Sequence, residues 1–150
     1  MNPALKDDAF LQGRIRWAAK RHGLPSSHAF FVSDQRDSAA SLLERIPKDS
    51  RIGEAVLIFA TAGSDWSVVS SRGVGGELEG RWHEVPFAEI DDLRGFPEEN
   101  EFPTKHKRQL DTLSVKAGGR SFQFKASPGE EFFALWNVCL RLVQVSKNAV

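Results

Sequence analysis

Cysteine is almost absent from this sequence, and its scarcity excludes two kinds of site. Cys139 is the single cysteine among 150 residues, so the chain can form no intramolecular disulfide and no zinc site of several thiolates. Such cysteine usage is typical of a reducing compartment. Residues 1–8 carry no basic segment followed by an apolar one, the pattern of a secretory signal. We therefore expect a cytoplasmic protein.

An excess of charge of either sign is also missing. Lys and Arg number 20, Asp and Glu number 20, and the formal net charge is zero. Bulk attraction to nucleic acid is therefore not expected, and any binding to an anionic surface would need a local patch. The longest apolar runs are far shorter than the ~20 residues of a membrane-spanning helix. Hydrophobic residues at 41% and charged residues at 27% predict one ordinary globular domain.

The sequence lacks the common motifs of metal and catalytic chemistry. The glycine-rich run 72–76 has no lysine and hydroxyl of a phosphate loop, so it predicts a turn or bulge. Cys139 falls on the apolar face of a predicted helix, where a thiol behaves as a small hydrophobe. No histidine pair has helical spacing; the four histidines are His22, His28, His83 and His106. We predict no metal, no cofactor and no catalytic residue.

Apolar periodicity predicts three helices. The first covers residues 7–22 and ends before Gly23 and Pro25; the second covers 38–46 and is ended by Pro47. The third follows Ser127-Pro128-Gly129-Glu130, which has the pattern of an N-cap, a proline at the first helical position and a capping-box glutamate. One broad apolar face predicts that this helix packs on a sheet; it holds Phe132, Leu135, Trp136, Cys139, Leu142 and Val143.

Between the second and third helices the sequence has the composition of β-strands. Apolar and β-branched runs are separated by glycine and proline, and a Gly-Gly pair at 118–119 stands between two alternating segments, which indicates a hairpin. The apolar run 29–32 is too short to assign. The predicted strands are 55–59, 66–70, 78–85, a short one ending at Leu93, and the hairpin over 113–124, with a long exposed loop over 96–108.

Three stretches of this β-rich part resemble a known family. Residues 53–57 form an apolar first strand after a helical lead-in, 68–72 resemble a second strand with a Thr-x-x-Arg step in which Ser70 replaces threonine, and 85–93 resemble an Ile-Pro-aromatic-x-x-Ile-x-x-apolar segment. With the terminal helix, they are similar to the bacterial pleckstrin-homology-like (PH-like) domains over about residues 41–145.

The resemblance implies an α+β fold, an antiparallel β-barrel or sandwich capped by the C-terminal helix. Residues 1–37 would form an N-terminal helical extension and residues 38–150 the PH-like domain, in one compact unit. Eukaryotic relatives that bind phosphoinositides carry basic residues between the first two strands, but here the loop 61–65 has no cation and one acid. An inositol phosphate needs several charge-assisted bonds, so the resemblance implies a shape without that ligand.

Two features remain as candidate contact sites. Lys105, His106, Lys107 and Arg108 form the compact basic cluster of the chain, although the acidic stretch 98–101 lies just upstream. Trp17 lies on the first helix, outside the expected barrel, so the apolar face of that helix must be buried against the barrel or against another chain.

These observations predict a non-enzymatic PH-like binding module that acts through protein–protein contact or self-association. One alternative is weak binding to a membrane surface or an anionic ligand through residues 105–108. Another is an enzyme whose site lies on loops and has no recognisable motif. A protein partner or a homo-oligomer is expected, and nucleic acid is not.

Overall fold

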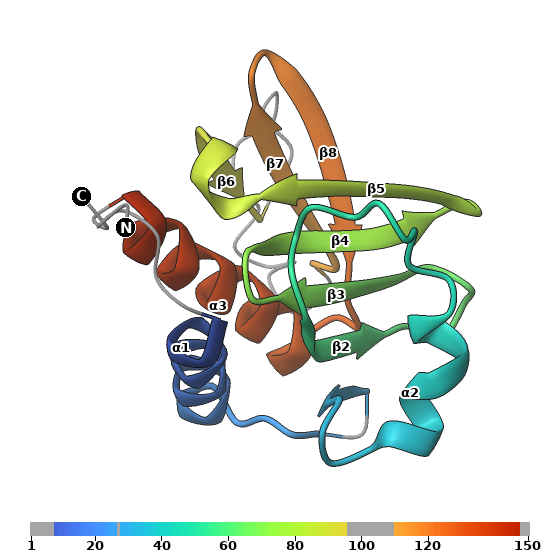
Figure 1. The fold of residues 1–150 in the computed structure, drawn as a ribbon. Coiled ribbons are helices and arrows are strands. Elements are labelled where there is room, and N and C mark those ends of the chain that lie inside the picture. Colours follow the sequence, from blue (N-terminus) through green and yellow to red (C-terminus); the bar gives the residue numbers. More distant parts are fainter. Residues whose placement is uncertain (1–7, 27, 96–109, 148–150) are drawn as a thin grey trace.

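The computed structural model describes residues 8–26, 28–95 and 110–147, and in these ranges the fold is α+β with two antiparallel sheets (Figure 1). The first sheet has strand order β1-β2-β3-β4-β5 and the second β6-β7-β8. The strands are β1 (Ala29–Phe31), β2 (Ala55–Ala60), β3 (Trp66–Ser70), β4 (Gly73–Leu78), β5 (Arg81–Pro86), β6 (Asp92–Arg94), β7 (Thr112–Ala117) and β8 (Arg120–Lys125). The helices are α1 (Asp8–Arg21), α2 (Arg36–Leu43), α3 (Glu130–Lys147) and the 3-10 helix η1 (Phe87–Glu89).

The main core lies between the two sheets and α3. Phe132, Leu135 and Leu142 of α3 are fully buried and share one cluster with the inward side chains of both sheets. In β7 buried and half-buried residues alternate, as expected for a strand with one face on a core. The sequence-based prediction that the last helix packs on the sheet is confirmed.

Helix α1 packs on its own chain. It lies beside α3 in Figure 1, and Leu11 and Ile15, which are 4% and 0% exposed, belong to the same core cluster. The segment 1–37, predicted as an N-terminal helical extension with the run 29–32 unassigned, also supplies β1, an edge strand paired antiparallel with β2.

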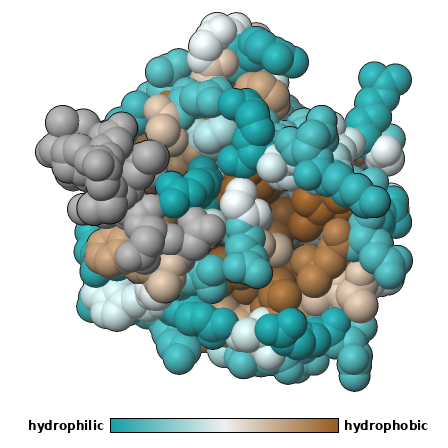
Figure 2. All heavy atoms as spheres, viewed as in Figure 1, coloured by the Kyte–Doolittle hydropathy of each residue, from teal (hydrophilic) through white to brown (hydrophobic). Residues whose placement is uncertain are grey.

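A second apolar cluster covers the outer face of the five-stranded sheet. Ile58, Val68 and Trp66 form part of it, and half-buried side chains of α2, Leu42 and Leu43, pack against them. Figure 2 shows apolar surface gathered in a hollow over this sheet, next to α2.

A closed barrel is not formed in the described ranges, which corrects that part of the predicted fold. The two sheets are separate, and β8 is joined to the five-stranded sheet by side chains that bond to main-chain oxygens instead of by a strand ladder. Ser67 Oγ donates to the carbonyl of Lys125 at 2.7 Å, and the ring of His83 bonds the carbonyl of Gln123.

The predicted strand 78–85 is confirmed over residues 81–85 as part of β5, but its start is wrong because a tight turn lies at residues 79–80. Glu79 and Gly80 have φ values of 53° and 79°, the left-handed pair of a type I′ hairpin turn between β4 and β5. Gly80 is a common turn residue, but glutamate is unusual at the first turn position, so the pair does not match the usual Asn-Gly or Asp-Gly pattern.

The glycine-rich run 72–76, predicted as a turn or bulge, instead belongs to strand β4 from Gly73 onward. The absence of a side chain at Gly75 leaves space for the side chains of Trp82 and Ile52, which pack there on the sheet. A Cβ atom at Gly75 would lie 2.7 Å from Cζ2 of Trp82 and 2.9 Å from Cδ1 of Ile52. Close approach of side chains, and not a tight turn, therefore accounts for this glycine.

Helix α3 begins later than predicted. Ser127 donates its hydroxyl to the carbonyl of Ala60 at 3.1 Å, and Gly129, with φ of 96°, precedes the first helical residue, Glu130. The predicted capping box at Ser127 is therefore wrong, because a tertiary hydrogen bond uses the hydroxyl. Helix α2 lies two to three residues earlier than the predicted 38–46.

Candidate functional site

The first candidate surface is centred on Trp17, which is 44% exposed. Arg14, Trp17 and Arg21 follow each other on α1 at spacings of three and four residues, so they lie along one side of the helix. Arg141 reaches the same indole ring from α3. We call these residues together with Leu140, which is 41% exposed, the Trp17 face.

Three guanidinium groups surround the indole of Trp17. The guanidinium carbons of Arg14, Arg21 and Arg141 lie 5.1, 4.9 and 5.2 Å from the ring centre, within the range of cation–π attraction. The Nε atoms of Arg14 and Arg141 are buried and have no hydrogen-bond partner among the residues that the structure describes. The face therefore holds several cations whose donor groups are not used within the described part of the chain.

A groove of about 310 Å³ separates α1 from α3 at this face. Trp17 and Leu140 supply its exposed apolar surface, and among the described residues no carboxylate lines it. The other lining residues are Ala18, Arg21, His22, Asn137, Arg141 and Gln144. A chain with zero net charge thus has a locally cationic and partly apolar face.

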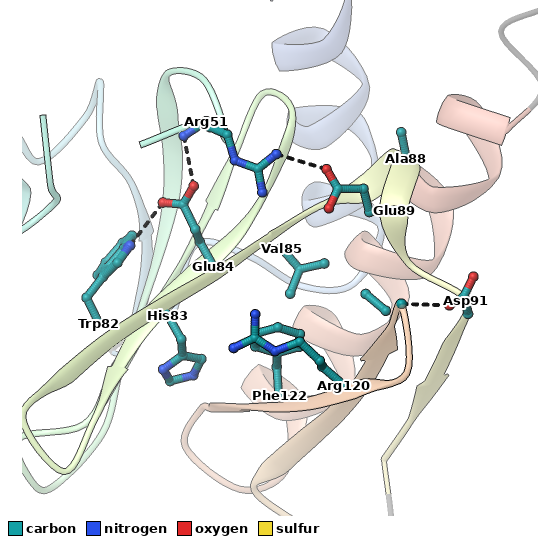
Figure 3. Close-up of a pocket in the computed structure, with 12 residues that line it drawn as sticks. Arg51, Trp82, His83, Glu84, Val85, Ala88, Glu89, Asp91, Arg120 and Phe122 are labelled. Atoms are coloured by element: carbon teal, nitrogen blue, oxygen red, sulfur yellow. Dashed lines mark hydrogen bonds and ion pairs between the residues drawn. The ribbon is translucent and has the colours of Figure 1, made fainter. Parts of the chain in front are cut away.

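The second candidate surface is a cleft of about 660 Å³ between β5, η1 and the tip of the β7–β8 hairpin, shown in Figure 3. We call it the β5 cleft. Trp82, His83, Glu84 and Val85 of β5 line one side, and Arg120 and Phe122 of β8 line the other.

The carboxylates of the β5 cleft are engaged in structural hydrogen bonds. Glu84 accepts bonds from the Ser50 hydroxyl at 2.7 Å, the Arg51 amide at 2.8 Å and the Trp82 indole at 3.0 Å. Burial acts to raise the pKa of Glu84, but these bonds outweigh it and the pKa is lowered. Glu89 pairs with Arg51 at 3.0 Å. Glu84 of β5 and Glu89 of η1 therefore bind Ser50 and Arg51, in the segment before β2.

On the opposite side of the β5 cleft, Arg120 is a cation that is not used in an ion pair within the described ranges. The guanidinium of Arg120 lies 5.3 Å above the ring of Phe122 and points into the cleft in Figure 3. In the described ranges Arg120 has no carboxylate partner and remains exposed. It can therefore neutralise an anionic group that enters the cleft.

The described residues show no arrangement for nucleophilic or metal chemistry. Burial raises the pKa of the Cys139 thiol, and its side chain is 0% exposed. No group of three or more metal-ligating side chains is present in residues 8–26, 28–95 and 110–147. In the same ranges no helix has the length and apolar character needed to cross a bilayer.

The sequence-predicted contact sites have different outcomes. Lys105, His106, Lys107 and Arg108 lie outside the described residues. Trp17 is exposed, while the apolar face of α1 is buried on its own chain. The role of Trp17 in an interface stays a prediction.

Sequence reasoning missed two features of these surfaces. The recurrence of Arg14, Trp17 and Arg21 along one side of the first helix was a visible signal for the cationic face. The meeting of Arg141 with Trp17, and the β5 cleft as a whole, join segments distant in sequence and left no local signal.

Comparison with known proteins finds no match to this chain among family models, curated proteins or solved structures.

Proposed function

We propose that this chain is a non-enzymatic, PH-like binding module whose Trp17 face contacts a protein that presents carboxylates beside an apolar side chain. The observation that carries the proposal is the exposed indole of Trp17 with three guanidinium groups around it. Tryptophan and arginine are the residues most enriched among those that dominate binding energy at protein interfaces.

The PH-like part of the proposal is supported by the order of the elements. Four antiparallel strands, β2 to β5, are followed by a second sheet of three strands and then by the long helix α3. This order, with the two sheets packed around one core and α3 against them, is the arrangement expected from the resemblance of residues 53–57, 68–72 and 85–93.

The charge of the face favours a different protein over a second copy of the same face. In a symmetric pair the same patch of both copies forms the interface, which would bring the cluster of Arg14, Arg21 and Arg141 against the same cluster of the second copy. Like charges brought together at an interface cost several kcal/mol. An acidic partner instead satisfies the guanidinium donors.

A protein is favoured over a lipid surface by the stacking of the arginines. When a protein binds a bilayer surface, an indole lies at the interface and the apolar side chains next to it reach the acyl chains. Here Arg14, Arg21 and Arg141 lie within about 5 Å of the ring, so moving Trp17 inward would carry charges toward the hydrocarbon. A protein groove with carboxylates can enclose the ring and the charges together.

The experiment is site-specific photo-crosslinking in the cells that express the chain. We would place the photoreactive residue p-benzoylphenylalanine at Leu140, which is exposed beside Trp17, and at Lys48 as a control on another part of the surface. We expect a discrete protein adduct from position 140 and not from position 48.

The adduct should depend on the face itself. Trp17→Ala and the combined Arg14→Gln, Arg21→Gln, Arg141→Gln change should remove it, whereas Arg36→Gln on α2 should not. Equal adducts from positions 140 and 48, or an adduct unchanged by both variants, would reject the proposal. Salt-resistant co-sedimentation with phosphatidylserine vesicles, lost in the triple variant, would replace the protein partner by a membrane surface.

A further inference from the structure

We propose a second binding site, separate from the Trp17 face: the β5 cleft takes an extended peptide segment that adds to the free edge of β5 and places a carboxylate on Arg120. The site is built by a strand edge, a cleft alongside it and a cation inside it.

The edge of β5 offers unpaired backbone groups. The hairpin pairs Leu78 with Arg81 and Gly76 with His83 around a two-residue turn, so the N–H and C=O groups of Trp82 and Glu84 point away from β4. In the described part of the chain these four groups have no hydrogen-bond partner. They form a template for another strand.

The adjacent sheet cannot use this edge. The outward carbonyls of Gln123 and Lys125 in β8 accept bonds from the side chains of His83 and Ser67. Those side-chain bonds hold β8 against the five-stranded sheet without a ladder between β5 and β8. The edge of β5 therefore remains open toward the cleft.

The cleft has the size and direction of an extended segment. It runs along β5 from Trp82 to η1, with the β7–β8 hairpin as its opposite wall, and has a volume of about 660 Å³. The outward groups of Trp82 and Glu84 are two residues apart, about 6.8 Å along a strand, which is the repeat of a paired antiparallel strand. Pro86 has no N–H and ends the strand, so pairing is limited to a short segment.

The charges of the cleft select the chemistry of the segment. Glu84 and Glu89 already accept structural bonds, and Arg51 is paired with Glu89. Arg120 is the cation that these bonds leave available, stacked on Phe122. An extended segment with an aspartate or glutamate on the side of Arg120, and an apolar residue that meets Phe122, fits both wall residues.

The experiment is selection of a phage-displayed random heptapeptide library on the full chain. We expect enriched peptides without proline in the pairing segment and with an acidic residue at one fixed position. Binding of a selected synthetic peptide should slow hydrogen exchange of the Trp82 and Glu84 amides, because those amides become ladder donors.

Two variants and two controls decide the outcome. Arg120→Gln should weaken binding of the synthetic peptide by about tenfold or more, as expected for loss of a charge-assisted bond. Ala88→Trp, which fills the cleft from an exposed position of η1, should abolish binding without touching the strand edge. Arg36→Gln should have no effect, and neither should Trp17→Ala, which separates this site from the Trp17 face.

Failure of the library to enrich any peptide would overturn the proposal. So would selected peptides that bind the Ala88→Trp variant as tightly as the parent, or that leave exchange at Trp82 and Glu84 unchanged. A selected peptide that binds the β5 cleft, together with no Trp17-dependent adduct, would reject the proposed function and leave the cleft proposal standing. A Trp17-dependent adduct without any cleft-binding peptide would do the opposite.

Discussion

His83 of β5 bonds the main-chain carbonyl of Gln123 in β8 through Nε2, and this contact joins the two sheets, which share no strand ladder in the described ranges. The same ring lies 4.8 Å from the ring of Phe124, centre to centre. The side chain of His83 thus makes both a polar and an aromatic contact between β5 and β8.

Replacement of His83 should separate these two contributions. His83→Phe keeps a ring beside Phe124 and loses the bond, which should lower the free energy of unfolding by about 1 kcal/mol. His83→Ala loses both and should cost about 2 kcal/mol. Chemical denaturation measures the change, with the exposed His22→Ala as control. Equal stability of the parent and His83→Ala would show that the packing of β5 against β8 does not depend on this residue.

Alanine at Gly75 should destabilise the protein, although the same change is harmless elsewhere. The new Cβ would lie 2.7 Å from Cζ2 of Trp82, and the required shift should cost about 1 to 3 kcal/mol. At Gly63 no atom lies within 4 Å of the added Cβ, so Gly63→Ala should be neutral or slightly stabilising, by about 0.5 kcal/mol. Urea denaturation of the pair tests the packing. Similar midpoints for both variants would contradict it.

The buried carboxylate of Glu77 should make stability depend on pH in the acid range. Glu77 is 9% exposed and accepts bonds from Trp66 Nε1 at 2.7 Å and from the guanidinium of Arg45. Burial acts to raise the pKa of Glu77, but the bonds from Arg45 and Trp66 outweigh it and lower the pKa below 4.5.

A lowered pKa in the folded state means that the stabilisation is fully present above the unfolded-state pKa and is lost as pH falls through the folded-state pKa. Glu77→Gln should cost about 2 kcal/mol at neutral pH. The difference between parent and variant should shrink below about pH 4.5, the usual value for glutamate. Thermal unfolding from pH 7 to pH 3 tests this. A difference that stays constant with pH would contradict the assignment.

Cys139 should react slowly with thiol reagents in the native state. Its side chain is 0% exposed, and burial raises the thiol pKa, so little thiolate is present or accessible. A Ser41→Cys, Cys139→Ala variant, with the thiol on the exposed side of α2, should react at once with one equivalent. Rapid labelling of the parent without denaturant would show that α3 is not packed as described.

The sequence predicted those parts of the fold whose signals are local. The strand Trp66–Ser70 and the hairpin around Gly118 and Gly119 lie where periodicity and turn residues placed them. The glycines of β4 were misread because the reason for them, contact with Trp82 and Ile52, comes from segments distant in sequence. The same limit applies to the β5 cleft.

At the Trp17 face the sequence predicted Trp17 as a contact residue but not the guanidinium groups around its ring. The helical period placed Trp17 on an element outside the sheets, but Arg141 is more than a hundred residues away in the chain. Only tertiary packing of α1 on α3 brings the third guanidinium to the indole. The helix alone therefore indicated two of the three cations of the face, and the contribution of Arg141 was not predictable from it.

The size of the complex that contains the chain tests the central claim most directly. Size-exclusion chromatography of a fresh cell extract should place the parent in a complex larger than the purified monomer, and should place Trp17→Ala at the position of the monomer while it remains folded. Elution of the parent as a monomer in the extract, or elution of both proteins in the same complex, would contradict the assignment of the Trp17 face as a protein-binding surface.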